Sequence, residues 1–64
     1  MNRHFLNGFQ IPEKKAKTHV ERVLFEHGYD PVEIRDIWEQ ANEANGEEFR
    51  DSLIDIGIEI VITH

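Results

Sequence analysis

The sequence contains no cysteine, so neither disulfide bonds nor thiolate metal ligands are available to its 64 residues. A chain of this length buries only about 60% of the surface that it exposes when unfolded, which is close to the lower limit for independent folding. We expect one domain over residues 1–64. A cytoplasmic location is the default expectation, because nothing in the composition argues for an oxidising compartment.

Long apolar runs are also missing from the sequence. No segment approaches the ~20 apolar residues that cross a bilayer, and the opening residues lack the apolar core of a signal peptide. We therefore expect neither a membrane-spanning segment nor a cleaved leader, and no membrane among the partners.

Residue patterns that commonly carry catalysis are scarce. Ser52 is the only serine and lies outside any nucleophile motif, and the four glycines are spread singly, so no phosphate-binding loop is predicted. His19 and His27 are eight residues apart on one predicted helix, and a rise of ~12 Å prevents them from sharing an ion. His4 and His64 would meet only if the two ends of the chain pair as antiparallel strands. We expect no catalytic residues, no metal site and no cofactor.

Positive charge is in short supply, with seven Lys and Arg against thirteen Asp and Glu and a formal net charge of −6. Residues 1–28 carry five cations and three acids (+2), whereas residues 29–64 carry two cations and ten acids (−8). A general nucleic-acid-binding protein needs clustered cations for phosphate contacts, so this class is disfavoured. The asymmetry favours partner selection or association through opposite faces, or it simply keeps a small domain in solution.

What the sequence does contain is a strong corner between two helices, in residues 27–34. Gly28 can adopt the left-handed conformation that closes a helix. Asp30 and Glu33 have the spacing of a capping box, and Pro31 suits the first position of the next helix. The rest of the predicted fold depends on this corner.

The N-terminal segment, residues 3–11, carries the pair Asn7-Gly8 between Leu6 and Phe9, which is a strong signal for a tight β-hairpin. The flanking arms are only three or four residues long. A single strand bulged at Gly8, or an irregular apolar arm, is therefore an alternative.

The first helix is predicted over residues 13–27, after Pro12. Its predicted core face consists of Ala16, Val20, Val23, Leu24 and His27. Phe25 lies on the opposite side, among Lys14, Lys15, Thr18 and Arg22. Either Phe25 packs against the sheet or the N-terminal arm, or it is a recognition or dimer contact.

The second helix is predicted from residue 31 to about residue 45, with Asn45 and Gly46 ending it and Asn45 capping a short third helix from Glu47. Its inward face consists of Ile34, Ile37, Trp38 and Ala41. The apolar contacts of the third helix are predicted to come from Phe49 and Leu53, with Ile54 or Ile56.

Residues 56–63 alternate with a period of two and predict a strand. Its inward face consists of Ile56, Ile58, Ile60 and Ile62. The strand pairs either with the N-terminal segment or with the same strand of a second copy.

Acidic side chains form a predicted stripe opposite the inward face of the second helix. We call this set the acidic stripe: Asp36, Glu39, Glu43, Glu47 and Asp51. Side chains one helical turn apart are ~5–6 Å from each other, which is comparable to the phosphate spacing of a nucleic acid strand. The stripe can therefore imitate nucleic acid for a basic partner, or it is an ordinary solvated helix face.

Taken together, the sequence predicts an α+β domain with an N-terminal β-hairpin or arm, two helices joined at a tight corner, a short third helix and a C-terminal strand. We expect a non-enzymatic regulator or inhibitor that binds a larger protein through the acidic stripe, and a homodimer across the isoleucine-rich strand or through Phe25. Such a composition is compatible with phage or mobile-element accessory proteins. The alternative is a weak nucleic-acid-binding accessory protein that uses the basic-aromatic surface of Lys14, Lys15, Thr18, Arg22 and Phe25.

Overall fold

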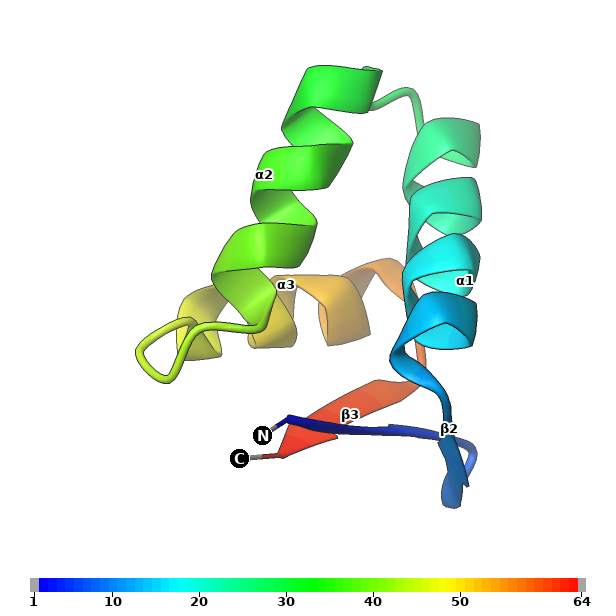
Figure 1. Cartoon of the computed structure of the whole chain (residues 1–64). Coiled ribbons are helices and arrows are strands. Elements are labelled where there is room, and N and C mark those ends of the chain that lie inside the picture. Colours follow the sequence, from blue (N-terminus) through cyan, green and yellow to red (C-terminus); the bar gives the residue numbers. More distant parts are fainter. Residues whose placement is uncertain (1, 64) are drawn as a thin grey trace.

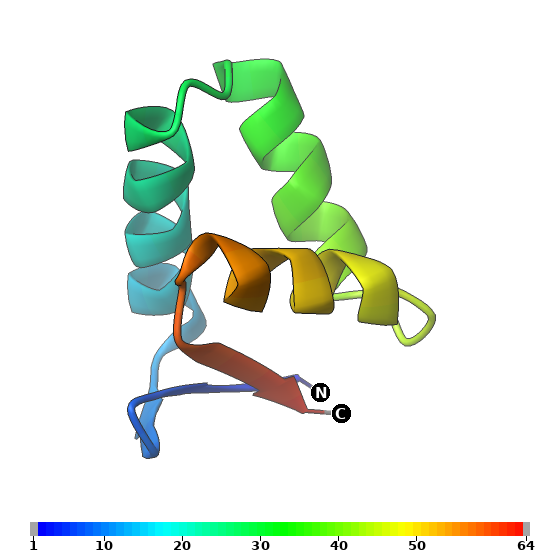
Figure 2. The same ribbon diagram turned by 180° about the vertical axis from the view of Figure 1, so that it is seen from behind.

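The computed structural model describes residues 2–63, which form a three-stranded antiparallel sheet with three helices on one face (Figures 1 and 2). The elements follow in the order β1 (Arg3–Leu6), β2 (Phe9–Ile11), α1 (Glu13–Glu26), α2 (Pro31–Ala41), α3 (Glu47–Ile56) and β3 (Ile60–Thr63). This arrangement confirms the predicted α+β class. The opposite face of the sheet carries no helix among these elements.

The N-terminal segment is the predicted hairpin, not a bulged strand or an irregular arm. Asn7 and Gly8 have φ angles of 54° and 84°, and two consecutive positive φ angles are the requirement of a type I′ turn. The turn joins β1 to β2 with Leu6 opposite Phe9 and His4 opposite Ile11.

The C-terminal strand pairs with the N-terminal segment of the same chain. β1 is the central strand, in the order β2-β1-β3, and the β1/β3 register runs from Arg3↔Thr63 to Leu6↔Ile60. The predicted approach of His4 to His64 concerns a residue outside the described part of the chain. The strands nearest the two ends of the chain, β1 and β3, are nevertheless antiparallel neighbours, as that prediction required.

The start of the last strand differs from the prediction. Ile56 is the last residue of α3, and Gly57 ends that helix with a φ of 99°, so β3 begins only at Ile60. Ile56 fits the period-two pattern of the strand because it also packs against the core, but it does so from the end of α3. The alternation itself is confirmed in β3, where Ile60 and Ile62 are buried and Val61 is exposed.

The core lies between the sheet and the helices, and every element except β2 supplies a buried residue to the sheet–helix interface. Its apolar members are Ala16, Val20, Leu24, Ile34, Trp38, Ala41, Leu53, Ile58, Ile60 and Ile62. Of the two alternatives for α3, Ile56 packs against this core and Ile54 is exposed. The prediction was wrong for His27, which is exposed at the end of α1, where its Nδ1 lies 2.9 Å from the carbonyl oxygen of Val23.

The first corner is confirmed in its details. Gly28 has a φ of 93°, and the amides of Gly28 and Tyr29 donate to the carbonyls of Phe25 and Leu24, both at 3.1 Å, which is a Schellman motif. Asp30 accepts a hydrogen bond from the amide of Glu33 at 2.9 Å, and the Glu33 carboxylate accepts one from the amide of Asp30 at 3.4 Å. These two bonds are the predicted capping box.

The second helix ends earlier than predicted, at Ala41 instead of about residue 45. The Asn42 side-chain amide donates to the carbonyl of Trp38 at 2.8 Å, and the Asn42 carbonyl accepts from the side-chain amide of Asn2 at 2.7 Å. The first bond closes the helix locally, and the second fixes its end from a distant part of the chain. Asn45 does not cap α3 either, because the N-cap position is Gly46 and no side chain caps that helix end.

Candidate functional site

The most buried polar residue is His4, which is 2% exposed and lies in the central strand. Its ring stacks on Trp38, with centroids 5.4 Å apart and planes inclined by 23°, and its Nε2 lies 2.7 Å from the side-chain oxygen of Asn42. Because Asn42 presents an oxygen, His4 Nε2 is the donor. No buried side-chain nitrogen or oxygen in residues 2–63 lacks a hydrogen-bond partner. This cluster is therefore a structural connection between β1 and the end of α2, and sequence reasoning missed it because His4 is 34 or more residues from both of its partners.

The acidic stripe is exposed along its whole length but does not follow one helix. Asp36 and Glu39 lie on α2, Glu43 lies in the connection after Ala41, and Glu47 and Asp51 lie on α3. Figure 1 shows that α2 and α3 run in clearly different directions from this connection. The stripe is therefore two short rows that meet at a bend, and the helical spacing assumed for all of it holds only within each row.

Arg50 closes the bend between the two rows. Its Nη1 donates to the carbonyl oxygens of Ala41 and Glu43, at 2.9 and 2.7 Å. This guanidinium therefore binds the end of α2 from the first half of α3. The other arginine of this half of the chain, Arg35, is exposed on α2.

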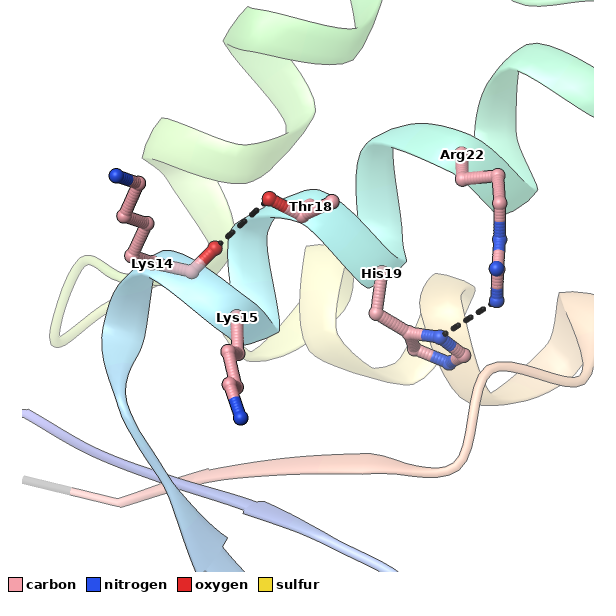
Figure 3. Close-up of a pocket in the computed structure, with 5 residues that line it drawn as sticks. All are labelled: Lys14, Lys15, Thr18, His19 and Arg22. Carbon is pink, nitrogen blue, oxygen red and sulfur yellow. Dashed lines mark hydrogen bonds between the residues drawn. The ribbon is translucent and has the colours of Figure 1, made fainter.

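The basic-aromatic surface borders a shallow hollow of about 470 Å³ on α1, which we call the basic hollow (Figure 3). Its lining consists of Lys14, Lys15, Thr18, His19 and Arg22. The side chains of Lys15, His19 and Arg22 extend to one side of the helix, whereas Lys14 extends to the other. An Arg22 side-chain nitrogen lies 3.4 Å from His19 Nδ1. Sequence reasoning missed His19, although its position one turn after Lys15 and one turn before Arg22 was the available signal.

Phe25 is 66% exposed, so the prediction that it packs against the sheet or the N-terminal arm is wrong. It borders a second hollow of about 370 Å³ between α1 and the start of α2, together with Thr18, Glu21, Arg22, Pro31 and Ile34. The alternative, that Phe25 is a recognition or dimer contact, stays a prediction.

Among residues 2–63, Asp30 is the one group whose pKa is clearly shifted. The hydrogen bond from the backbone amide of Glu33 lowers the pKa of its carboxyl group, and partial desolvation opposes this effect. Because the hydrogen bonds that lower the pKa belong to the helix cap, the shift reports the helix corner and not a catalytic group.

In residues 2–63, no group of three or more His, Asp or Glu side chains is placed to hold a metal ion.

No helix within residues 2–63 has the length and apolar character to cross a membrane.

In comparisons with known proteins, no protein family, no curated protein and no solved structure matched this chain. The surfaces described above are therefore the basis for any functional conclusion.

Proposed function

We propose that this chain is a non-enzymatic interaction protein that regulates or inhibits a larger cytoplasmic protein by binding it through the acidic stripe. The observation that carries the proposal is the distribution of charge. Residues 29–64 sum to −8, all five carboxylates of the stripe are exposed, and Arg50 is directed to backbone carbonyls at the bend. The matching partner surface is rich in Lys and Arg.

Such a surface acts mainly on association rate and specificity. Concentrated charge of one sign steers a complementary partner into contact and repels acidic ones, with an effect that falls as salt rises. A stable complex covers ~800 Å² on each partner. That area is about one sixth of the 4613 Å² surface of this protein, so a stable complex would have to extend over both rows of the stripe and the bend between them.

Charge reversal with a matched control tests this proposal. The variant Asp36→Lys, Glu39→Lys, Glu43→Lys changes three stripe carboxylates, and Glu13→Lys, Glu21→Lys, Glu26→Lys makes the same net charge change on α1. Affinity capture from native lysate should recover the partner with the wild type and the α1 variant but not with the stripe variant. Equal recovery with all three proteins would exclude the stripe as the contact.

The inhibitor version makes a further distinction. If the partner uses its basic groove for nucleic acid, duplex DNA or structured RNA added to the captured complex should release the partner in proportion to its concentration. Release by salt alone, with no effect of nucleic acid at constant ionic strength, would leave an interaction protein but reject imitation of nucleic acid.

A second candidate function is weak nucleic-acid binding by the basic-aromatic surface. The observation that favours it is the basic hollow, where Lys15, His19 and Arg22 extend to the same side of α1. Binding of a labelled oligonucleotide should then weaken steeply as salt rises, and Lys15→Glu with Arg22→Glu should abolish it. No binding at low ionic strength would reject this function.

The homodimer is part of the proposal and is tested by solution mass. A dimer has twice the chain mass of 7.5 kDa in light scattering after gel filtration. If the dimer forms through Phe25, Phe25→Ser should restore the monomer mass.

A further inference from the structure

The two edge strands of the sheet differ in their protection against pairing with another strand. β2 has three residues and is followed at once by Pro12, which has no amide proton to donate. β3 has four consecutive β-branched residues, Ile-Val-Ile-Thr, and contains no Pro, Lys or Gly, the residues that commonly blunt an edge. The β3 edge is therefore the one with the features of a template for an incoming strand.

A hollow of about 260 Å³, which we call the edge groove, lies between α3 and β3. Its lining consists of Glu47, Arg50, Asp51, Ile54, Ile60, Val61 and Ile62. This described lining includes no residue of β1 or β2, so the groove opens on the side of β3 that faces away from β1. Ile54 is 55% exposed and is the apolar residue that α3 contributes.

The edge groove has an apolar end and an acidic end. Glu47, Asp51 and Ile54 follow the spacing i, i+4, i+7 and so share one face of α3. Figure 2 shows α3 running above β3 in the opposite direction. Ile54 therefore lies toward the start of β3, and the two carboxylates lie toward its end.

We propose that the free edge of β3 binds an extended segment of the basic partner by strand addition, with an apolar side chain beneath Ile54 and a Lys or Arg beside Glu47 and Asp51. The inference rests on the proposed function, which supplies a basic partner. In this binding mode the main-chain hydrogen bonds give affinity, and the pockets for alternate side chains give sequence preference.

The spacing of the edge groove specifies the segment. The rise along the axis of α3 is ~4.5 Å between Asp51 and Ile54 and ~10.5 Å between Glu47 and Ile54. Neighbouring positions on one face of a strand are ~6.7 Å apart, which falls between these two values. An apolar residue and a cation two positions apart on the partner strand therefore match the groove.

Charge favours this partner over a second copy of the chain. Antiparallel pairing of β3 with β3 of another copy would bring the two α3 helices close together on one face of the joined sheet. Each α3 carries four acids and one arginine, so the carboxylates at the two grooves would repel each other. The side chains that a second β3 would place in the groove are isoleucines, which add no positive charge to the acidic end.

Peptide binding to ¹⁵N-labelled protein tests the inference. The probe is Thr-Val-Thr-Lys-Thr-Val-Thr-Lys, which places Val and Lys alternately on one face, and the control peptide has Glu in place of Lys. We expect amide shifts confined to residues 60–63 and the groove face of α3, and at least tenfold weaker binding of the Glu peptide. Shifts elsewhere, or none at millimolar peptide, would overturn strand addition.

Two controls separate strand addition from attraction by charge alone. The variant Glu47→Lys, Asp51→Lys should weaken the Lys peptide at least tenfold, whereas Glu48→Lys, Asp55→Lys makes the same charge change on α3 outside the groove and should weaken it less than threefold. A peptide with N-methyl groups on its four central residues keeps the charges but cannot pair, and it should not bind.

Each outcome bears on a different claim. Equal binding of the N-methylated peptide would reject strand addition while leaving the acidic stripe as a charged contact. A doubled solution mass together with protection of the β3 amides, without peptide, would show that a second copy occupies the edge and would also reject the inference. Failure of the stripe-reversal capture experiment would reject the proposed function, independently of peptide binding.

Discussion

The two turns that join the three helices are built in different ways. At the first turn, every hydrogen bond joins residues five or fewer positions apart, from the Schellman bonds of Gly28 and Tyr29 to the capping box of Asp30 and Glu33. At the second turn, in residues 42–46, local bonds such as that from the Asn42 side chain to Trp38 are joined by bonds from Asn2 and His4 on one side and from Arg50 on the other. The first turn is local, and the second is made by three parts of the chain.

The difference determines what each turn does for the fold. The first turn is exposed and can form in an isolated pair of helices, because its parts need no other element. The second turn gains its long-range bonds only when the N-terminal segment and α3 are in place. It therefore couples the N-terminal strand to both helices that carry the acidic stripe, and loss of any member should disturb all three elements.

The largest expected effect is on the second turn. His4→Ala removes a buried ring that stacks on Trp38 and leaves the side-chain oxygen of Asn42 without its closest donor. We expect a loss of about 3 kcal/mol in the free energy of unfolding, as for other buried aromatic truncations. Urea unfolding followed by circular dichroism measures it. His4→Phe keeps the stacking and should cost about 1 to 2 kcal/mol. No loss in His4→Phe would contradict the role of the hydrogen bond, and equal losses in both variants would contradict the role of the stacking.

Gly46→Ala should have the next largest effect. An added Cβ would overlap the carbonyl oxygen of Gln40 and lie 2.8 Å from its carbonyl carbon, although the φ of −91° is ordinary for any residue. The backbone must therefore shift, which we expect to cost about 2 to 3 kcal/mol by the same measurement. A stability equal to that of the wild type would show that the second turn can relax without loss.

Gly28→Ala should cost less, about 1 kcal/mol, because the site has open space for a Cβ and only the φ of 93° is unfavourable. Gly28→Asn is the matched variant, since Asn tolerates the left-handed conformation and should lose roughly half as much. If Gly28→Ala proves more destabilising than Gly46→Ala, the predicted overlap with the backbone of Gln40 at the second turn is wrong.

The smallest effect concerns the acidity of Asp30. Its pKa is lowered in the folded state by the amide of Glu33, so it adds stability that is present above pH ~4 and is lost as the pH falls through the lowered value. Asp30→Asn keeps a good capping side chain without the titration. The stability difference between the two proteins should therefore shrink below pH ~4. A difference that stays constant on acidification would contradict the capping origin of the shift.

The two turns also show which parts of the fold were predictable from the sequence. The hairpin at Asn7-Gly8, the closure at Gly28 and the capping box were predictable, because each depends on residues next to one another. The end of α2 was not, because Asn42 has no local signal as strong as Asn45-Gly46, and its bond to Trp38 is supplemented by bonds from residues about forty positions away.

The candidate surfaces show the same division. Exposure of the acidic stripe followed from its position opposite the apolar face of α2. The basic hollow needed the side-chain directions of Lys15, His19 and Arg22, and the edge groove needed the packing of α3 over β3. Helical periodicity predicted four of the five residues that line the basic hollow, whereas the edge groove has no signature in the order of residues.

The sequence by itself determined the elements of this protein: a hairpin, a helical corner, an apolar face on each helix and an excess of carboxylates after residue 28. These are set by φ preferences, capping bonds and side-chain periodicity, which act within a few residues. The tertiary structure decided where α2 ends, which strand β3 joins and which of the two sheet edges stays open. Those outcomes depend on burying His4, Trp38 and the isoleucines together, and that free energy is available only when distant segments meet.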